Sequence, residues 1–418
     1  NNSNTNGGYN IEAGYVAKAN DKGLSQANTA GTNFWTDDRY ISVWNVGTTF
    51  TESTNPTVGS MEKLMKGDTK YEASTAQSVN NDNTLLAVWG SEANMMYDSV
   101  LGNSRYKNVS PGDSGAFGTP PSQVDICMVN GIPFYAILDD TWKDAGTFGF
   151  GLMLLRDGHI ASNNVGVVEK TGTDKVRNQF QNPKIAGVYT VASNDSKAKS
   201  YHMYVSYYDK YTQCLKYGKV EWRDKIGSDN GDRISNITAN DNKSIVVDGL
   251  DTVNSGNNVG EFSDIKVIDN DNTTPTPIIV YYDRNNKCLK FAKGEENADD
   301  HSVKWTITKI NNPSSGIDFG RYVAMEMDDN NGLHVVAQDV TKGILYCGYF
   351  AIGVAASPTG GWKTVDATGS VGRWNDIKLE NPEGKSILAC KPVITSMDSS
   401  KLNTTSAIKL ARYIDETN

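Results

Sequence analysis

An all-β fold built from about seven four-stranded units is what this sequence predicts, and three observations predict it. One motif occurs twice with matched spacing, as YVSYYDKYTQCLKYGKV from Tyr204 and as IIVYYDRNNKCLKFAKG from Ile278. Apolar and polar residues alternate with a period of two through many short segments, which is typical of strands. Turns rich in Asn, Asp and Gly separate these segments.

The units share one order of elements. An opening segment comes first, at residues 123–128, 180–185, 262–268, 319–324 and 374–379. A polar turn and a second β-rich run follow, as at 278–282, 332–337 and 386–390. A third run, such as 288–291, and a fourth that often holds Trp, such as 303–308, complete the unit. Degraded copies lie at 39–44, at 84–97 and at 132–155.

Copies recur at intervals of roughly 55 to 80 residues, and four-stranded units repeated radially form a β-propeller. We therefore predict one β-propeller domain over residues 1–418, with a parallel β-helix as the alternative fold. The strand around Tyr15 and Val16 is expected to pair with the last unit near 407–413, which would remove an exposed sheet edge. Residues 60–66, SMEKLMK, predict one short helix.

The interval between copies exceeds that of a compact blade, so several loops are expected to be long. Residues 102–122, 158–178 and 225–260 are the longest of these predicted loops. Binding and catalytic residues are disproportionately found on such loops.

Charge and composition exclude some function classes. The formal net charge is −9 and the pI is near 5.1, so nucleic acid and anionic membrane are not predicted partners. No apolar run approaches the roughly 20 residues that span a bilayer. The Asn- and Thr-rich turns and the acidic surface favour a secreted or surface-displayed protein, and the start NNSNTNGG favours a mature or trimmed chain. The five Cys, including the repeat-related Cys214 and Cys288, are expected to be mostly free, buried thiols.

The pattern of an opening Asp-Ile, then Val-Tyr-Tyr-Asp at 280–283, then Leu-Lys and an aromatic at 289–291 resembles the repeats of sialidase-like bacterial β-propeller proteins. The resemblance covers most of the chain after about Asn178 and implies the fold alone. Sialidases of this class carry Ser-x-Asp-x-Gly-x-x-Trp boxes and an Arg-Ile-Pro segment. Neither is present here, since 359–365 matches only the end of a box, and Arg39 and Arg321 begin different tripeptides. No catalytic residue is therefore transferred.

One face of a propeller holds both the connections between blades and the loops between second and third strands, and ligands usually bind there. Residues at the openings are predicted to surround this channel mouth: Asp125, Asn182, Asp264, Arg321 and Asp376, with Phe262, Phe319 and Trp374 beside them. Aromatic faces and planar hydrogen-bonding groups suit a sugar or a peptide. Each Asp can equally cap a turn. Arg321, which aligns where other units have Asp, can equally pair with Asp264 or Asp376.

The function favoured by the sequence is non-enzymatic binding of a glycan or protein ligand at this channel mouth. A sialidase-like glycoside hydrolase is the first alternative, and it needs two carboxyl groups roughly 5 to 10 Å apart. A structural subunit of a surface assembly, which associates with its own copies, is the second. No cofactor is predicted. The oxygen-rich segments 269–272 and 328–331 leave Ca²⁺ as an alternative to plain hairpin turns.

Overall fold

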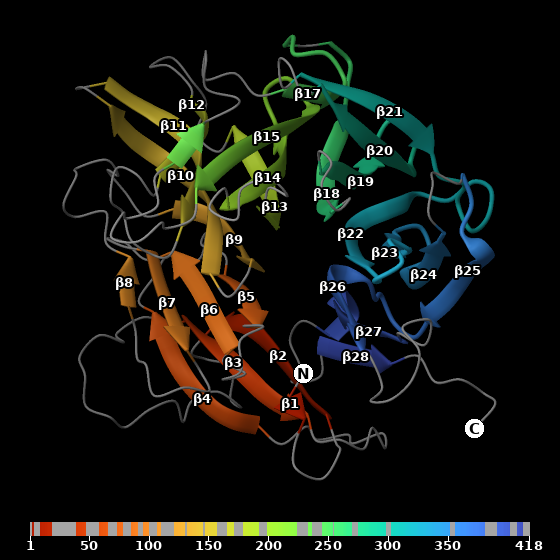
Figure 1. Ribbon diagram of the computed structural model, residues 1–418. Coiled ribbons are helices and arrows are strands. Elements are labelled where there is room, and N and C mark those ends of the chain that lie inside the picture. The colour runs from red at the N-terminus through yellow and green to blue at the C-terminus, as the bar shows by residue number, and fades with distance from the viewer. Residues whose placement is uncertain are drawn as a thin grey trace. The chain divides into compact units, whose positions relative to one another are not determined.

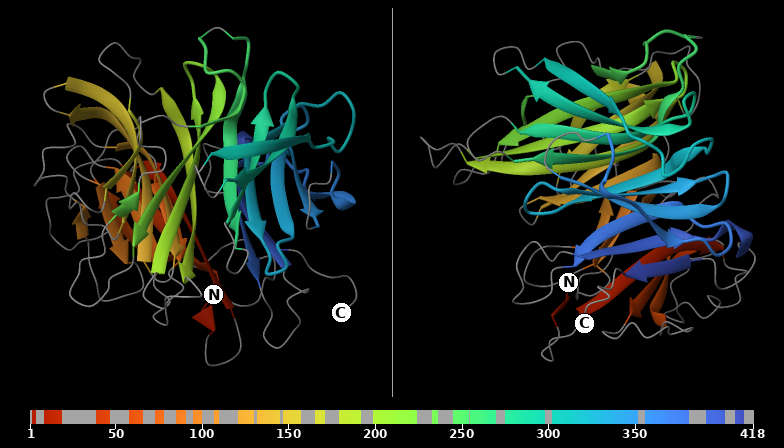
Figure 2. Two further views of the ribbon diagram at one scale, coloured as in Figure 1. Left: turned by 45° about the horizontal axis from the view of Figure 1, so that its top comes forward. Right: turned by 90° about the vertical axis from the view of Figure 1, so that its right-hand side faces the viewer.

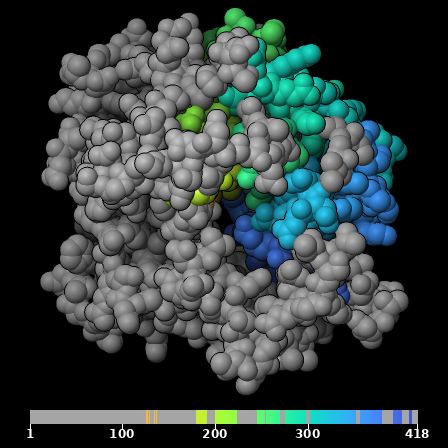
Figure 3. Space-filling model, viewed as in Figure 1, coloured from red at the N-terminus to blue at the C-terminus, as the bar shows by residue number. Residues whose placement is uncertain are grey.

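The structure is a computed structural model of the chain (Figure 1). In residues 1–178 the structure describes the backbone of the strands, and it describes side chains only at positions 125, 127, 129, 134 and 136. Backbone and side chains are described together over 179–190, 200–222, 245–253, 255–269, 275–297, 302–351, 356–379, 391–400 and 409–411. Figure 3 shows these side chains in colour, and nearly all of them belong to the region after residue 178.

The chain divides into two compact units, residues 1–178 and 179–418, and each is described by itself. The first unit contains β1 (Asn2–Ser3), β2 (Tyr9–Lys18), β3 (Arg39–Val46), β4 (Val58–Met65), β5 (Ala73–Gln77), β6 (Leu85–Gly90), β7 (Met95–Ser99), β8 (Lys107–Val109), β9 (Pro121–Val129), β10 (Ile132–Asp144), β11 (Thr147–Arg156) and β12 (Val165–Lys170). These strands form three antiparallel sheets in the orders β1-β2-β3-β4, β5-β6-β7-β8 and β12-β11-β10-β9.

The second unit begins with β13 (Phe180–Val191), β14 (Lys199–Asp209), β15 (Cys214–Arg223), β16 (Arg233–Ser235) and β17 (Ile245–Asp248), where β16 and β17 both pair with β15. The next sheets are β18 (Val259–Ile268), β19 (Thr276–Asp283), β20 (Cys288–Glu296), β21 (Val303–Lys309), and then β22 (Phe319–Met327), β23 (Leu333–Asp339), β24 (Ile344–Phe350), β25 (Thr359–Asp366). The last holds β26 (Arg373–Glu380), β27 (Lys391–Met397) and β28 (Ile408–Arg412), with a 3₁₀ turn η3 (Ser399–Lys401).

Small antiparallel sheets whose strands follow one another in chain order have the arrangement of β-propeller blades, so the predicted all-β propeller class is confirmed. In the second unit the opening strands β13, β18, β22 and β26 follow one another from sheet to sheet (Figures 1 and 2). Pairing groups the described strands into seven sheets, four of them in the second unit. A closed ring of about seven blades in one domain remains a prediction.

Among the described side chains of the second unit, three apolar clusters hold the sheets together, and each cluster joins two successive sheets. One joins β13–β17 to β18–β21 through Tyr204, Tyr217 and Ile279. The next joins β18–β21 to β22–β25 through Leu289 and Phe319, and the third extends to β26–β28. Each sheet therefore buries its apolar faces against its neighbours, as blades do.

Several sequence predictions differ from the structure. Residues 60–66 lie largely in β4, because pairing with β3 overrides the helical propensity of Glu, Leu, Met and Lys. The three predicted long loops each contain a short outer strand: β8, β12, and the pair β16 and β17. These strands are too short to show a periodic signal. Among the described pairings β2 joins β1 and β3 while β28 joins β27, and the predicted pairing between the first and last strands remains a prediction.

Candidate functional site

The doubled Tyr-Tyr-Asp motif is part of the scaffold. An Asp stands at this position in all four sheets of the second unit, as the last residue of the second strand or, for Asp398, directly after it. The four residues, each at most 1% exposed, are Asp209, Asp283, Asp339 and Asp398. In each case a carboxylate oxygen accepts at least one backbone N–H of the following turn, such as those of Tyr211 and Thr212 or of Thr341 and Lys342. The Asp therefore caps the turn between second and third strands.

The Lys of the same motif holds neighbouring strands together. Lys290 lies 2.8 Å from both Asp283 and Asp248, and Asp248 belongs to the preceding sheet. Lys409 similarly reaches Asp366 of the preceding sheet, at 2.8 Å. At the boundary between β18–β21 and β22–β25 the pair is replaced by Ile310 and Tyr346, which meet in an apolar cluster.

The strand registers align the four opening strands. Ile185, Ile265, Met325 and Ile377 pair with Val205, Ile279, Val335 and Ile394, each at the same spacing from the turn Asp. Four residues before the aligned apolar position stand Glu261, Arg321 and Arg373. Three residues before it stand Phe262, Tyr322 and Trp374. Directly before it stand Asp264, Ala324 and Asp376. The predicted alignment of Arg321 with the Asp positions is therefore wrong, because Ala324 stands there.

A β-bulge interrupts each of these opening strands just before the aligned apolar residue. Glycines at positive φ precede it, at +94° in Gly260, +124° in Gly320 and +92° in Gly372. A Cβ on Gly260 would lie 2.7 Å from the Leu215 side chain, and one on Gly320 would lie 2.9 Å from Leu289. Only Gly allows the strand to enter so close to the preceding sheet. Bulges re-aim side chains, and here they re-aim the aromatic position.

Phe262, Tyr322 and Trp374, which we call the aromatic row, form a continuous contact across three successive sheets. Ring centroids are 4.4 Å apart between Phe262 and Tyr322 and 5.2 Å apart between Tyr322 and Trp374. Trp374 is 55% exposed, and the other two rings are half-buried. Tyr322 and Trp374 hold left-handed backbone, with φ of 52° and 50°, which is an outlier for bulky residues. Asn182 occupies this position in β13 and has φ of 53°.

Charged side chains precede each aromatic residue. Glu261 pairs with Arg284 at 3.2 Å. Arg321 pairs with Asp318 at 3.2 Å and lies 5.6 Å from the ring centroid of Tyr282. Asp318 also accepts a hydrogen bond from the Tyr282 hydroxyl. Burial raises the pKa of Tyr282 to about 12, with the hydrogen bond to Asp318 adding to it.

The predicted polar site residues mostly bind backbone. Asp264 accepts the N–H groups of Ile265 and, across the sheet boundary, of Met325 at 2.7 Å. Asn182 donates its amide to the carbonyl of Glu261 on the next opening strand. Asp376 accepts the N–H of Ile377 and is otherwise exposed. These contacts fix the opening strands relative to one another.

Two predicted residues lie elsewhere. Phe319 is fully buried and packs edge-on against Tyr346 and Trp362, so its ring presents no face to a ligand. Asp125 is half-buried in β9 of the first unit. Tyr322 was not predicted, although the repeated Gly-charged-aromatic tripeptides at 260–262, 320–322 and 372–374 mark the position. The structure therefore brings together Phe262, Trp374, Arg321 and the unpredicted Tyr322.

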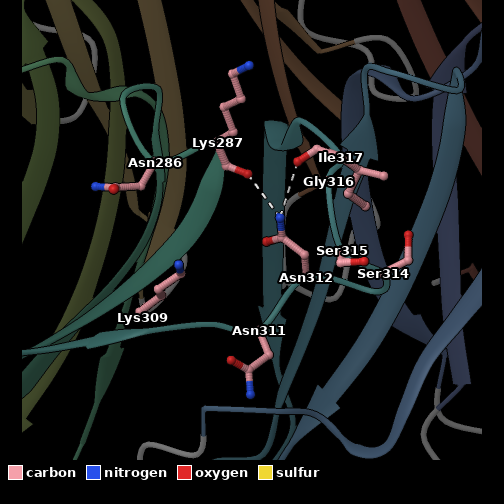
Figure 4. Close-up of a pocket in the computed structure, with 9 residues that line it drawn as sticks. All are labelled: Asn286, Lys287, Lys309, Asn311, Asn312, Ser314, Ser315, Gly316 and Ile317. Atoms are coloured by element: carbon pink, nitrogen blue, oxygen red, sulfur yellow. Dashed lines mark hydrogen bonds between the residues drawn. The ribbon is translucent and has the colours of Figure 1, made fainter.

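A hollow of about 550 Å³ lies between the β19–β20 turn and the connection from β21 to β22 (Figure 4). Asn286 and Lys287 contribute from the turn, Lys309 from the end of β21, and residues 311–317 from the connection. These are the two kinds of loop that the propeller topology places on one face.

Among the described residues, no group of three or more His, Cys, Asp or Glu side chains is close enough together to hold a metal ion. In the segment 328–331, Asp328 accepts the N–H groups of Asn330 and Gly332 and so caps a hairpin turn. Residues 270–272 lie outside the described residues. Within the described part of the chain, no helix is long and apolar enough to cross a membrane.

Comparisons with known proteins identify no family: no family model and no curated protein matches the sequence. The sialidase-like resemblance thus remains a prediction. Solved structures with a similar fold include a fucose-recognising lectin of Aleuria aurantia described as a six-bladed β-propeller, at 9% identity and a TM-score of 0.39, over 82% of this chain and 94% of that one. The polysaccharide lyase Uly1 is 8% identical, with a TM-score of 0.43, and the match covers 97% of this chain and 100% of that one. A family 43 endo-arabinanase of Bacillus licheniformis is 11% identical, with a TM-score of 0.31, and the match covers 84% of this chain and 97% of that one. Identities and TM-scores this low carry no argument about ligand or activity.

Proposed function

We propose that this protein binds glycans, with the aromatic row as the principal contact surface. The observation that supports this most is the position of Tyr322 and Trp374. Left-handed backbone at bulky residues costs on the order of 1–3 kcal/mol each and persists mainly where it serves a site. Here it accompanies ring contacts that link three sheets, and Trp374 remains 55% exposed instead of joining the core.

The row has the chemistry that sugars require. The C–H faces of a pyranose pack on aromatic rings, while its hydroxyls need planar hydrogen-bonding groups nearby. Glu261, Arg321 and Arg373 directly precede the three rings and offer such groups. A secreted or surface-displayed location would suit such a protein, and it is supported by the acidic surface and the Asn- and Thr-rich turns.

The test is a glycan array followed by calorimetric titration of the strongest ligand. We expect Trp374→Ala to weaken binding at least tenfold, about 1.4 kcal/mol, with an unchanged far-ultraviolet circular dichroism spectrum. The matched control is Tyr211→Ala, because Tyr211 is 46% exposed on the β14–β15 turn, outside the row. A blank array, or equal loss in both variants, would contradict the proposal.

Two alternative functions are outcomes of the same experiments. Release of sugar products from any arrayed glycan would favour a sialidase-like hydrolase. Asp264, one carboxylate near the row, favours binding instead, because both of its oxygens accept backbone N–H groups. Concentration-dependent assembly on size-exclusion chromatography, with no glycan bound, would favour a structural subunit.

A further inference from the structure

The hollow between the β19–β20 turn and the β21–β22 connection has an unusual balance of charge. Two lysines line it, Lys287 and Lys309, and no acidic side chain does. The whole chain has the opposite balance, with 49 acidic residues against 40 Lys and Arg. Among the described residues neither ammonium group has an ion-pair partner, unlike Lys216, Lys290 and Lys409 of the scaffold. Neither of the two charges is therefore neutralised by a described carboxylate.

The polar groups around the lysines favour a hydroxyl-rich ligand. Figure 4 shows Asn312 between Lys309 and Asn286 on one side and Ser314 and Ser315 on the other. Asn312 donates to the carbonyls of Lys287 and Ile317, at 3.0 and 3.4 Å, which fixes the orientation of its amide. Its Oδ1 is buried and has no hydrogen-bond partner. An O–H donor on an occupant would relieve this unsatisfied acceptor.

The chain connects this hollow directly to the aromatic row. Residues 311–317 lead into β22, the strand that carries Arg321 and Tyr322. Asp318, at the junction, accepts from Tyr282 and pairs with Arg321, so the junction is held by side chains of two sheets. Ile317, which lines the hollow, precedes Tyr322 of the row by only five residues.

We propose that this lysine pocket receives the anionic group of an acidic glycan, a carboxylate or a sulfate ester borne on a sugar. The inference rests on the proposed function, because the row binds the sugar faces while the pocket selects the charge. An acidic peptide is the competing occupant. The exposed hydroxyls of Ser314 and Ser315 favour the saccharide, because each sugar hydroxyl can both donate to them and accept from them, whereas a glutamate peptide donates only through its backbone N–H groups.

The experiment compares three trisaccharides in calorimetric titrations with the full chain: galacturonate, 6-sulfated galactose and neutral galactose. We expect at least one acidic probe to bind ten times more tightly than the neutral one at low salt. The double variant Lys287→Gln with Lys309→Gln should remove this difference. The double variant Lys304→Gln with Lys363→Gln is the matched control, because these lysines are exposed on β21 and β25 outside the pocket and their loss changes the net charge equally. The better of the two acidic probes identifies carboxylate or sulfate as the group.

The outcomes separate the inference from the proposed function. Equal affinities for all three probes, with binding still weakened by Trp374→Ala, would overturn the pocket and leave the aromatic row. A lysine-dependent preference for a hexaglutamate peptide over both acidic sugars would overturn it in favour of a protein ligand. No binding of any probe together with a blank glycan array would overturn both.

Discussion

The left-handed backbone of Tyr322 and Trp374 determines where their rings lie in the aromatic row. At ordinary strand dihedrals the side chains of an opening strand alternate between its two flanking sheets. The bulge and the left-handed φ of 52° and 50° break that alternation and bring the rings into line. Asn375 supports the arrangement by donating to the carbonyls of Tyr322 and Gly372, at 2.8 and 2.9 Å.

The glycine before each bulge gives the first prediction. Gly320→Ala should lower the free energy of unfolding by about 2–3 kcal/mol, because a φ of +124° is strained for Ala and the new Cβ would lie 2.9 Å from Leu289. Urea denaturation measures this. Gly256→Ala is the control: its φ is +78°, yet no atom lies within 4 Å of the added Cβ. Equal losses in both variants would show that backbone strain alone, without the clash, sets the effect.

The buried turn-capping carboxylates give a second prediction, because two of them differ in their surroundings. Asp283 lies 2.8 Å from Lys290, so Asp283→Asn leaves a half-buried ammonium with one carboxylate fewer, and should cost about 2 kcal/mol. Asp339 faces no cation among the described residues, and its Oδ2 is buried without a partner. Asp339→Asn should therefore change stability by less than about 1 kcal/mol. Similar large losses at both positions would contradict this account.

At the scale of elements, the repeat was readable from the sequence and its register was not. The motif YYDxxxxCLK occurs with the same spacing in two repeats of this chain, which identifies the second and third strands and predicts that the motif belongs to the scaffold. The sequence alone aligns Phe319 with Phe262, because each Phe follows an acidic residue and begins the opening segment of its unit. Pairing shows that Phe319 matches Val259, three residues before the aromatic position. A bulge changes the count of residues without changing composition, so periodicity alone misses it.

A row of charges also joins the opening strands. Glu326 of β22 lies between Lys266 of β18, at 3.1 Å, and Lys378 of β26, at 2.8 Å. All three residues directly follow the aligned apolar position of their strands. Burial alone would raise the pKa of Glu326, but the two ammonium groups outweigh it and lower the pKa to about 2.

This lowered pKa predicts a pH dependence of stability. A carboxyl group whose pKa is lower in the folded state stabilises the fold above its unfolded pKa, near 4.3, and loses that contribution as pH falls toward about 2. The wild type should therefore be about 2 kcal/mol more stable than Glu326→Gln above pH 5, and the difference should vanish near pH 2. Urea denaturation across this range measures it. Glu295→Gln, at an exposed position of β20, should show no such dependence.

At the scale of the whole second unit, the apolar clusters of the described residues lie between sheets and not within one sheet. Each apolar cluster takes residues from two successive sheets, as Tyr217 and Ile279 do, or Leu289 and Phe319, or Leu345 and Ile394. Unfolding one sheet therefore exposes the apolar face of the next. In repeat proteins such interfaces couple the stabilities of neighbours, and the coupling here runs through all four sheets.

Alkylation of the thiols of Cys214 and Cys288 can measure this coupling. Cys214 and Cys288 are fully buried at equivalent third-strand positions of successive sheets, and both are free. Burial raises the pKa of Cys214 to about 11 and also raises that of Cys288, so neither should be alkylated in the native protein at pH 8. Alkylation in increasing urea, read by peptide mass spectrometry, should give one common midpoint for both, because a shared cluster joins their sheets. Separate midpoints would show that the sheets unfold independently, and that the interfaces between them stabilise less than each sheet does by itself.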